Sequence, residues 1–342
     1  MRYNVLMKKI LATGGTGYIG SHTVVELINK GYEVEIVDNL FNSKITVLDK
    51  IEQITGKRPK FYEVDLLDAA KVDEIFAQGN YDAVIHFAGL KAVGESVEKP
   101  LLYYHNNIGG TLNLLDAMEK YGVKELIFSS SATVYGLQDT PNCVETMRTG
   151  GDITNPYGRT KFFIEEIIKD YVIAHPDFEA TILRYFNPIG AHASGLIGED
   201  PNGIPNNLMP IIMRVAEGRI AKLQVYGTDY PTEDGTCRRD YIHVVDLAKG
   251  HVAALEHMKA GVNIYNLGTG KATSVKEMIT AFEQASGREL PHEFAPRRAG
   301  DLAEIWANPT KAEQELGWHA ELTIADAMKD TINYLNKVKE TN

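Results

Sequence analysis

Residues 9–20 read KILATGGTGYIG, and this stretch decides the fold. A short apolar strand, Lys9–Thr13, leads into glycines at positions 14, 17 and 20, and an amphipathic helical pattern follows to Lys30. Glycines at this spacing allow a tight turn, a close approach of backbone to a pyrophosphate and close packing of helix on sheet. The free N–H groups at the helix start favour phosphate binding. The stretch predicts a dinucleotide-binding loop whose contacts are Gly14, Gly17, Tyr18, Ile19 and Gly20.

A second strand, residues 33–37, ends in Asp38, about 20 residues past the glycines, where such loops place an acidic side chain. A carboxylate there can accept hydrogen bonds from both hydroxyls of the adenosine ribose. It would repel a phosphate on the 2′ oxygen. The sequence therefore predicts NAD rather than NADP as the cofactor.

Strand and helix patterns alternate through the first half of the chain. Further buried strands are expected at 60–64, 82–87, 124–128 and 179–184, with helices near 69–78, 97–105, 107–120 and 155–174. This order predicts an α/β fold with a Rossmann-type doubly wound parallel sheet. From residue 188 the chain is richer in Gly, Pro and Asn and more irregular, which indicates a smaller mixed α/β domain. The expected domains are 8–187 for NAD and 188–342 for substrate, with 240–267 returning to the main sheet.

Tyr157 and Lys161 stand four residues apart at the start of a helical pattern, so they share one helix face. An ammonium beside a phenol favours the phenolate, which lowers the pKa of the tyrosine and makes it a general base. Such a pair can take a proton from a carbinol. Ser129, Ser130 and Ser131 follow a strand, and we expect these hydroxyls at the carboxyl end of the sheet, facing the cofactor. His86 lies inside a strand and is interpreted as a core histidine.

Composition excludes several classes of function. The 342-residue chain has a formal net charge of -11 and no block of basic residues, which argues against nucleic acid or an anionic membrane as partner. No 18-residue apolar run occurs. Cys143 and Cys237 have no metal-ligand spacing and are interpreted as free thiols in a reducing cytoplasm, with no metal site. Residues 1–7 precede the first strand and are a leader or an alternative start.

Several longer motifs agree in order and spacing with one family. They are the glycine loop, Ala88-Gly89, Asn106-Asn107, the serine cluster and Tyr157-x-x-x-Lys161, together with the runs 86–96, 129–136, 184–187, 203–208 and 239–243. The chain resembles the extended short-chain dehydrogenase/reductases and, within them, the UDP-glucose 4-epimerases. The resemblance spans about residues 8–338.

The resemblance implies reversible epimerisation of UDP-glucose and UDP-galactose at C4, through a 4-keto sugar and tightly bound NAD, in galactose metabolism. Tyr157 would act as base, Lys161 would hold the nicotinamide ribose and depress the pKa of the tyrosine, and Ser131 would relay the proton. It also implies a homodimer, formed through helices around 97–120 and 154–174. Ile305 stands where the family has either a bulky tyrosine or a small residue, which predicts weaker activity on UDP-N-acetylhexosamines.

The resemblance also implies two sets of binding residues. The cofactor contacts beyond the glycine loop are Asp38, Asn39, Asn42, Ser43, Asp65, Leu66, Phe87, Ala88, Gly89, Lys91, Asn106, Ser131, Tyr157, Lys161 and Phe186. The UDP-hexose contacts are Lys91, Ser131, Tyr157, Phe186, Asn187, Asn207, Leu208, Gln224, Val225, Tyr226, Arg239, Arg298, Asp301 and Ile305.

Two other functions are compatible with this fold. A nucleotide-sugar 4,6-dehydratase carries Asp-Glu directly after the hydroxyl residue of the cluster, whereas this chain has Ala132 and Thr133. Elimination of water then lacks its acid and base. A non-catalytic NAD-sensing protein would have no reason to keep Ser131, Tyr157 and Lys161 together, and all three are present.

Overall fold

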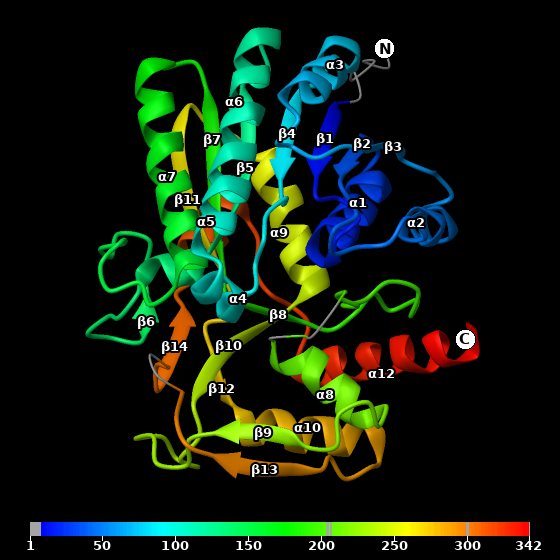
Figure 1. Ribbon diagram of the computed structural model, residues 1–342, viewed down its shortest axis with the longest axis vertical. Coiled ribbons are helices and arrows are strands. Elements are labelled where there is room, and N and C mark those ends of the chain that lie inside the picture. Colours follow the sequence, from blue (N-terminus) through cyan, green and yellow to red (C-terminus); the bar gives the residue numbers. More distant parts are fainter. Residues whose placement is uncertain (1–7, 203–204, 206, 299–300, 342) are drawn as a thin grey trace. The chain divides into compact units, whose positions relative to one another are not determined.

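The structure is a computed structural model that describes residues 8–202, 205, 207–298 and 301–341. Its contacts divide the chain into two compact units (Figure 1). The first unit contains residues 8–130, 155–183 and 251–264, and the second contains the remaining described residues. Residues 1–7, and positions 203, 204 and 206 of the run 203–208, lie outside the described residues.

A seven-stranded sheet forms the centre of the first unit, with the order β11-β7-β5-β4-β1-β2-β3. The pairs β1–β2, β1–β4, β2–β3 and β4–β5 are parallel. The chain adds strands outward from β1, first on one side and then on the other, as in a doubly wound sheet. This strand order confirms the predicted fold class. The strands are β1 (Lys9–Thr13), β2 (Glu33–Asp38), β3 (Lys60–Glu63), β4 (Ala83–His86), β5 (Glu125–Ser131), β7 (Glu179–Tyr185) and β11 (Gly261–Leu267).

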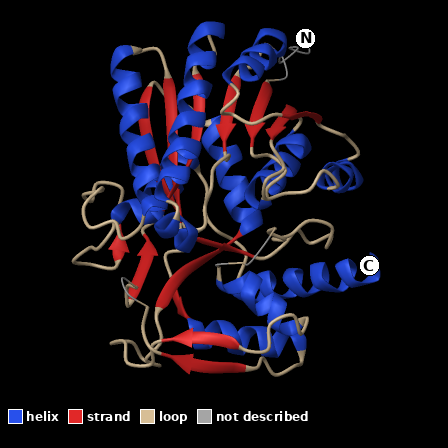
Figure 2. Ribbon diagram, viewed as in Figure 1, coloured by secondary structure: helices blue, strands red, loops and turns tan. Residues whose placement is uncertain are grey.

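Helices cover this sheet because its strands are apolar on both faces. Leu11, Val84 and Phe128 pack into one core cluster with α3, α6 and α7, whereas the alternate residues Ile10 and Ile85 are buried on the opposite face. The helices up to residue 174 (Figure 2) are α1 (Tyr18–Lys30), α2 (Val47–Thr55), α3 (Ala69–Gly79), α4 (Val93–Glu98), α5 (Pro100–Tyr103), the π-helix η1 (Tyr104–Gly109), α6 (Gly110–Tyr121), the 3-10 helix η2 (Ala132–Tyr135) and α7 (Pro156–Ala174), and α9 (Val244–Glu256) follows later in the chain.

The second unit contains short strands and helices with a separate apolar core, to which α8, α10 and α12 contribute. Its larger sheet has the order β12-β10-β14-β6, with β8 also paired to β10, and β9 pairs with β13. The elements are β6 (Asn142–Cys143), β8 (Asn187–Ile189), α8 (Leu208–Ala216), β9 (Leu223–Tyr226), β10 (Arg238–His243), β12 (Ala272–Ser274), α10 (Val275–Ser286), β13 (His292–Ala295), β14 (Glu304–Ala307), α11 (Thr310–Leu316) and α12 (Ile324–Thr341).

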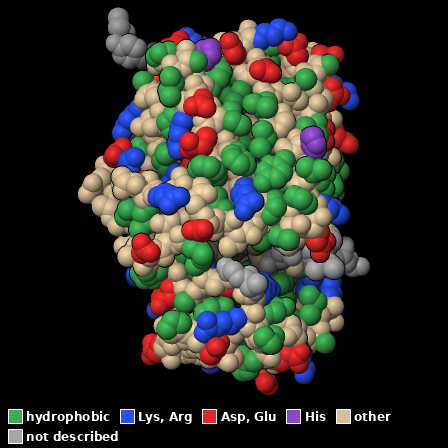
Figure 3. All heavy atoms as spheres, turned by 60° about the vertical axis from the view of Figure 1, so that its left-hand side comes forward, with side chains coloured by type: hydrophobic (Ala, Val, Ile, Leu, Met, Phe, Trp, Pro, Cys, Tyr) green, Lys and Arg blue, Asp and Glu red, His purple; other side chains and the backbone are tan. Residues whose placement is uncertain are grey.

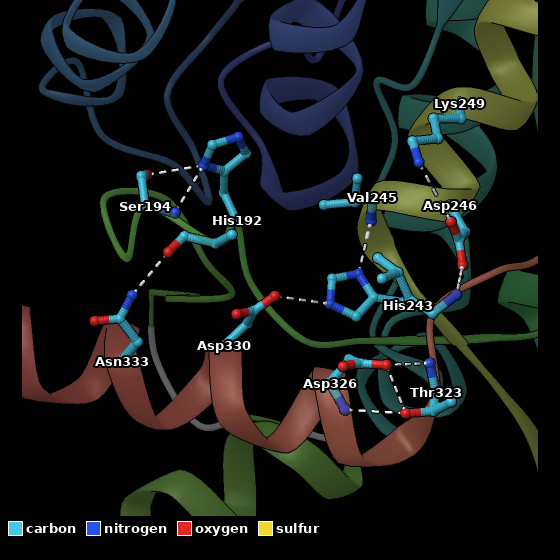
Figure 4. A network of polar contacts seen from close by, with 12 residues as sticks. His192, Ser194, His243, Val245, Asp246, Lys249, Thr323, Asp326, Asp330 and Asn333 are labelled. Atoms are coloured by element: carbon cyan, nitrogen blue, oxygen red, sulfur yellow. Dashed lines mark hydrogen bonds and ion pairs between the residues drawn. The ribbon is translucent and has the colours of Figure 1, made fainter.

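Polar contacts attach α12 to the end of β10 (Figure 4). His243 Nε2 lies 3.4 Å from Asp330 Oδ2, and His243 Nδ1 accepts a hydrogen bond from the N–H of Val245 (3.1 Å). Asn333 Nδ2 donates to the carbonyl oxygen of Ala193 (2.8 Å). Burial lowers the pKa of His243 to about 4, so this contact holds a neutral imidazole at neutral pH.

The unit boundaries differ from the expected domains in two places. Residues 131–154 group with the second unit, although we expected them in the first domain. Within 240–267, β11 lies in the main sheet as expected, whereas β10 pairs with β8, β12 and β14 of the second unit. The single helices expected at 97–105 and 107–120 are interrupted by the π-helix at 104–109.

Candidate active site

The glycine loop between β1 and α1 accepts no larger side chain at its key positions. Gly14 has a φ of +70°, and a Cβ atom on it would lie 2.7 Å from the backbone nitrogen of Ala88. A Cβ atom on Gly20 would collide with the carbonyl oxygen of Gly14. α1 begins at Tyr18, and its first turn contains no acidic residue. These positions of the loop are therefore limited to glycine, and the loop leads into a helix N-terminus that suits an anionic pyrophosphate.

Hydrogen bonds hold the Asp38 carboxylate at the end of β2. Its Oδ1 accepts from Leu40 N–H (2.9 Å) and Ser43 Oγ (3.1 Å), and its Oδ2 accepts from Thr16 N–H (3.2 Å). The Thr16 and Ser43 hydroxyls are 2.7 Å apart, and because Ser43 donates to Asp38, Thr16 is the donor of that bond. The glycine loop, Asp38 and Ser43 thus form one connected group.

The end of β3 joins the same edge of the sheet. Asn39 Nδ2 donates to Asp65 Oδ2 (2.9 Å), and the backbone N–H of Leu67 donates to Asp65 Oδ1 (2.9 Å). The carbonyl oxygen of Leu66 accepts from Asn113 of α6 (2.8 Å). The expected adenosine residues Asp38, Asn39, Ser43, Asp65 and Leu66 therefore lie at neighbouring strand ends, and Asn42 belongs to the connecting loop.

α7 begins at a well-defined residue, which fixes where its first side chains lie. Asn155 Oδ1 accepts a hydrogen bond from the Gly158 N–H (2.8 Å), and Pro156 occupies the first helical position. Thr160 Oγ1 donates to the carbonyl oxygen of Tyr157 (2.7 Å). Tyr157 therefore sits in the first turn of a capped helix.

Lys161 is buried one turn further along α7. Its Nζ donates to the carbonyl oxygen of Ser129 (2.7 Å) and lies 4.9 Å from the centroid of the Phe128 ring. Burial lowers the pKa of the Lys161 ammonium to about 8, and the attraction of Glu165 opposes that shift. The ammonium is thus still charged at neutral pH. A charged lysine four residues from Tyr157 can stabilise a phenolate.

The three serines at the end of β5 make different contacts. Ser129 accepts from Lys161 through its carbonyl, and Ser130 Oγ donates to Glu165 Oε1 (2.5 Å). Ser131 Oγ accepts from the backbone N–H and the hydroxyl of Thr133 (3.2 and 3.0 Å). Because Ser131 Oγ accepts twice within the described structure, its own O–H is the group suited to donate to a substrate oxygen.

His86 is a fully buried histidine with both ring nitrogens bonded. Nδ1 lies 2.7 Å from Thr13 Oγ1 and Nε2 lies 2.9 Å from Thr111 Oγ1. The Thr111 hydroxyl donates to the carbonyl oxygen of Asn107 (2.7 Å), so it accepts from the Nε2–H of a neutral ring. Burial, with the nearby charge of Lys161, lowers the pKa of His86 to about 3. The interpretation of His86 as a core histidine is consistent with these contacts.

The π-helix links the loop after β4 to α7. Asn107 Nδ2 donates to Leu90 O (3.0 Å) and Thr160 Oγ1 (3.0 Å), and its Oδ1 accepts from Leu90 N–H (2.8 Å) and Asn106 Nδ2 (3.0 Å). π-Helical turns often occur at functional sites. The loop that contains Phe87, Ala88, Gly89 and Lys91 is therefore fixed relative to the helix that carries Tyr157.

Three of the expected substrate residues lie on neighbouring strands of the second unit. Arg239 of β10 is in register with Ile305 of β14, and Tyr241 further along β10 is in register with Asn187 of β8. Arg239 Nη2 lies 3.7 Å from Asp301 Oδ1. The structure thus brings together Asn187, Arg239, Asp301 and Ile305 around β10.

The remaining expected substrate residues have differing environments. The guanidinium of Arg298 lies 3.9 Å above the Tyr226 ring, and Gln224 donates to Glu293. Val225 is fully buried in the core of the second unit, so only its backbone can reach a ligand. Leu208 starts α8, Asn207 Nδ2 donates to Glu199 Oε1 (3.3 Å), and the buried Phe186 donates its N–H to Leu267.

Comparisons with known proteins agree with this geometry. Residues 10–268 match the family model described as the NAD dependent epimerase/dehydratase family. The chain belongs to this family. It is 57% identical to a UDP-glucose 4-epimerase of Bacillus subtilis (strain 168), over 94% of this chain and 95% of the relative.

Solved structures are also similar to this chain. One is a UDP-glucose 4-epimerase from Bifidobacterium longum in complex with NAD+ and UDP, with a TM-score of 0.94 and 54% identity over 98% of this chain and 100% of the other. Another is the UDP-Glc/GlcNAc 4-epimerase from Campylobacter jejuni, with a TM-score of 0.84 and 36% identity over 96% of this chain and 99% of the other.

The sequence interpretation assigned no function to Thr133 or Glu165. The position of Thr133 in the site follows from its two hydrogen bonds to Ser131, and no sequence pattern predicts these bonds. Glu165 could have been noticed, because an acidic residue eight positions after Tyr157 falls on the buried face of the helix.

Both cysteines are free thiols. Within the described residues, no helix is long and apolar enough to span a membrane, and no cluster of His, Cys, Asp or Glu could hold a metal.

Proposed function

We propose that the protein interconverts UDP-glucose and UDP-galactose by inverting C4 of the hexose through a 4-keto sugar. Relatives above 50% identity over nearly the whole chain carry the name UDP-glucose 4-epimerase. The observation that carries the proposal is the capped start of α7, with Tyr157 in its first turn and the charged, buried Lys161 one turn later. This arrangement is suited to removing a proton from a secondary hydroxyl near neutral pH.

The first unit fits NAD as its cofactor. The glycine loop is so tight that a Cβ atom on Gly14 or Gly20 would collide with backbone, and its helix has no acidic residue in the first turn to repel a pyrophosphate. Asp38 would hold the ribose hydroxyls, and Asn39, Ser43 and Asp65 lie beside it. Bound NAD supplies a nicotinamide that accepts the C4 hydride and gives it back. The further residues proposed to hold it are Asn42, Leu66, Phe87, Ala88, Gly89, Lys91, Asn106 and Phe186.

The side chains of this protein move and hold the proton. Tyr157 takes the proton of the C4 hydroxyl, and the Lys161 ammonium stabilises the resulting phenolate. Ser131 donates a hydrogen bond to the reacting oxygen and passes the proton between that oxygen and Tyr157. After the sugar has turned, the proton would return to the C4 oxygen and the hydride to the opposite face of C4, so the configuration at C4 inverts without net oxidation.

Turning of the hexose requires that the nucleotide stay bound while the sugar is held loosely. Arg239 and Arg298 are proposed to hold the diphosphate, since the guanidinium fork donates paired hydrogen bonds to phosphate oxygens. Asn187, Asn207 and Leu208 would line the same site. The uridine would contact residues 224–226 and Asp301.

The test is an assay without added cofactor. Purified protein is incubated with UDP-galactose and then removed, and UDP-glucose in the protein-free filtrate is detected afterwards with UDP-glucose dehydrogenase and the NAD that this second enzyme requires. We expect UDP-glucose to form, and Lys161→Met should form far less. Absence of UDP-glucose even after addition of NAD would refute the proposed function. A parallel incubation with UDP-N-acetylgalactosamine measures the weaker activity that we propose for the N-acetylated pair.

A dehydratase is less well supported by the contacts of the serine cluster. The positions at which that reaction needs an acid and a base are Ala132 and Thr133, and both polar groups of Thr133 bond to Ser131. A protein that only senses NAD would not need this hydrogen-bonded cluster. Formation of a 4-keto-6-deoxy sugar in the assay would favour the dehydratase.

We also propose that the protein is a homodimer acting in cytoplasmic galactose metabolism. Two free cysteines fit a reducing compartment. Large apolar side chains are exposed on α4 to α7, and hydrophobic side chains gather between scattered charges on the face turned forward in Figure 3. The exposed large apolar side chains of these helices are Val93, Val97, Leu101, Leu102, Leu112, Phe163 and Ile173. An apolar helix face of this kind pairs readily with its copy across a two-fold axis.

Sedimentation of charged variants tests the dimer. Leu101→Asp combined with Phe163→Asp should produce a monomer at micromolar concentration, because each carboxylate would be buried opposite an apolar surface. Ile45→Asp is the matched control, since Ile45 is similarly exposed but lies outside these helices. A monomeric unmodified protein, or equal dissociation of the control, would contradict the proposal.

A further inference from the structure

Glu165 is a completely buried carboxylate in the second turn after Tyr157. Its side chain has no exposed surface, and its Oε1 accepts a hydrogen bond of 2.5 Å from Ser130 Oγ. Burying a carboxylate is costly unless hydrogen bonds and an opposite charge compensate it. An acidic residue at a core position of a helix therefore needs a nearby cation.

The nearby cation is Lys161, four residues earlier on the same face of α7. The two side chains reach consecutive residues of β5, because Lys161 Nζ donates to Ser129 O while Glu165 accepts from Ser130 Oγ. Tyr157, Lys161 and Glu165 follow one another at intervals of four. They form a single row along the helix, and its last two members are both attached to β5.

Other groups around Lys161 do not replace Glu165 as a counter-charge. His86 of β4 is neutral and Phe128 of β5 presents a ring. Near Tyr157, the Tyr103 phenol of α5 donates to Glu95 Oε2 (3.0 Å), and the charge of Glu95 is shared with Lys99. Within the described structure, Glu165 is the carboxylate whose charge opposes the lowering of the Lys161 pKa.

We propose that Glu165 is a positioning residue that keeps the Lys161 ammonium charged and fixed in place, so that Lys161 can stabilise the Tyr157 phenolate. This inference rests on the role proposed above for Lys161 and Tyr157. The negative charge of Glu165 keeps Lys161 protonated, and the hydrogen bond from Ser130 orients the Glu165 carboxylate.

The sign of the effect follows from the environment of Lys161. Burial already lowers the pKa of this ammonium to about 8. Removing the negative charge of Glu165 would lower the pKa further, so Lys161 would lose its proton at a lower pH. A neutral amine no longer stabilises the phenolate, and catalysis at the alkaline end of the pH range would fail first.

The experiment measures the titration of Lys161 directly as well as turnover. Protein carrying bound NAD and isotope-labelled lysine is titrated by NMR, with Lys161→Met used to assign the signal. In Glu165→Gln, which keeps the shape and can still accept from Ser130, we expect the pKa of Lys161 to fall by about one unit, the low end of the effect of a close opposite charge. The alkaline limb of the kcat profile should move by the same amount, with KM for UDP-galactose unchanged.

Two further variants separate charge from structure. Ser130→Ala removes the hydrogen bond but keeps the carboxylate, and Glu165→Asp keeps the charge on a shorter side chain. Both should leave the pKa of Lys161 near its original value. An unchanged Lys161 pKa in Glu165→Gln, or an equal fall in Ser130→Ala or Glu165→Asp, would overturn the inference. If Lys161→Met instead retains full turnover, the proposed role of Lys161 fails, and the NMR titration still reports on Glu165.

Discussion

Replacing Ile305 should change the balance between UDP-hexoses and UDP-N-acetylhexosamines. Ile305 lies on β14, in register with Arg239 of β10, and its side chain is half-buried. β14 cannot easily shift into a gap, because Arg238 Nη1 contacts Glu304 (3.4 Å) and the N–H of Ala307 donates to the buried Asp240 (3.1 Å). Ile305→Gly should therefore leave open the space that the side chain filled.

The expected change in substrate preference follows from the space that the Ile305 side chain fills. A few misplaced methyl groups in a pocket discriminate between substrates by about 1–3 kcal/mol, or roughly 10- to 200-fold. Isoleucine is stiff at χ1 and cannot swing aside for an N-acetyl group. We expect Ile305→Gly to raise kcat/KM for UDP-N-acetylglucosamine about tenfold or more. Ile305→Tyr should suppress that activity with little change for UDP-galactose.

The assay compares kcat/KM for both substrate pairs in the same preparations. Ile305→Val removes a single carbon and should give an intermediate ratio. Glu304→Gln perturbs the neighbouring residue on the other face of β14 and should leave the ratio unchanged. If Ile305→Gly and Ile305→Tyr change both substrate pairs equally, position 305 does not face the C2 substituent, and the reasoning is refuted.

Three other perturbations test the first unit. Tyr157→Phe should reduce turnover by about 10²–10⁴-fold while UDP-sugar affinity, measured by calorimetry, stays close to that of the unmodified enzyme; near-normal turnover would exclude Tyr157 as the base. Asp38→Gly combined with Asn39→Arg should relax the preference for NAD, and equal affinity of the unmodified protein for NAD and NADP in fluorescence titrations would show that Asp38 does not select the cofactor. Burial acts to raise the pKa of Glu35, but hydrogen bonds from Lys9, Tyr81 and Tyr62 outweigh burial and leave that pKa below its usual value. The Glu35 carboxylate therefore stabilises the folded protein above the pKa that it has in the unfolded chain. This stabilisation is lost as the pH falls through the lower pKa of the folded protein. Thermal unfolding between about pH 6 and 3 should therefore show a steeper loss of Tm for the unmodified protein than for Glu35→Gln, and equal slopes would contradict this.

Much of the first unit could be predicted from local patterns. The strands of the main sheet are apolar on both faces, and the capped helix Pro156–Ala174 ends where its periodicity ends. The elements missed were short or depended on distant partners. β6 has two residues and pairs with β14 more than 160 positions away, and β8 and β12 are three-residue strands that form only against β10.

The candidate site divides in the same way. The spacing of the glycines, of Asp38 and of the Tyr157–Lys161 pair is typical of their chemistry, so the sequence alone indicated these residues. The bond between Thr133 and Ser131 and the contact of Glu165 with β5 depend on tertiary packing and could not be derived from spacing, although the spacing does place Glu165 on the buried face of the helix. The π-helix at 104–109 was likewise expected as ordinary helix, because i→i+5 hydrogen bonds depend on the packing around the helix and not on a particular order of residue types.

The division of the second unit into three chain segments also constrains how the protein folds during synthesis. β10, near residue 240, lies in the interior of its sheet, but its neighbour β14 is made some 60 residues later. Until Glu304–Ala307 leaves the ribosome, Arg238 and Arg239 of β10 lack their partners on β14, and the whole of β6 has no strand partner in this sheet. Unpaired strand edges of this kind promote aggregation. Truncation before β14 should therefore yield insoluble chains, even though the strands of the first unit's sheet are all complete by Leu267.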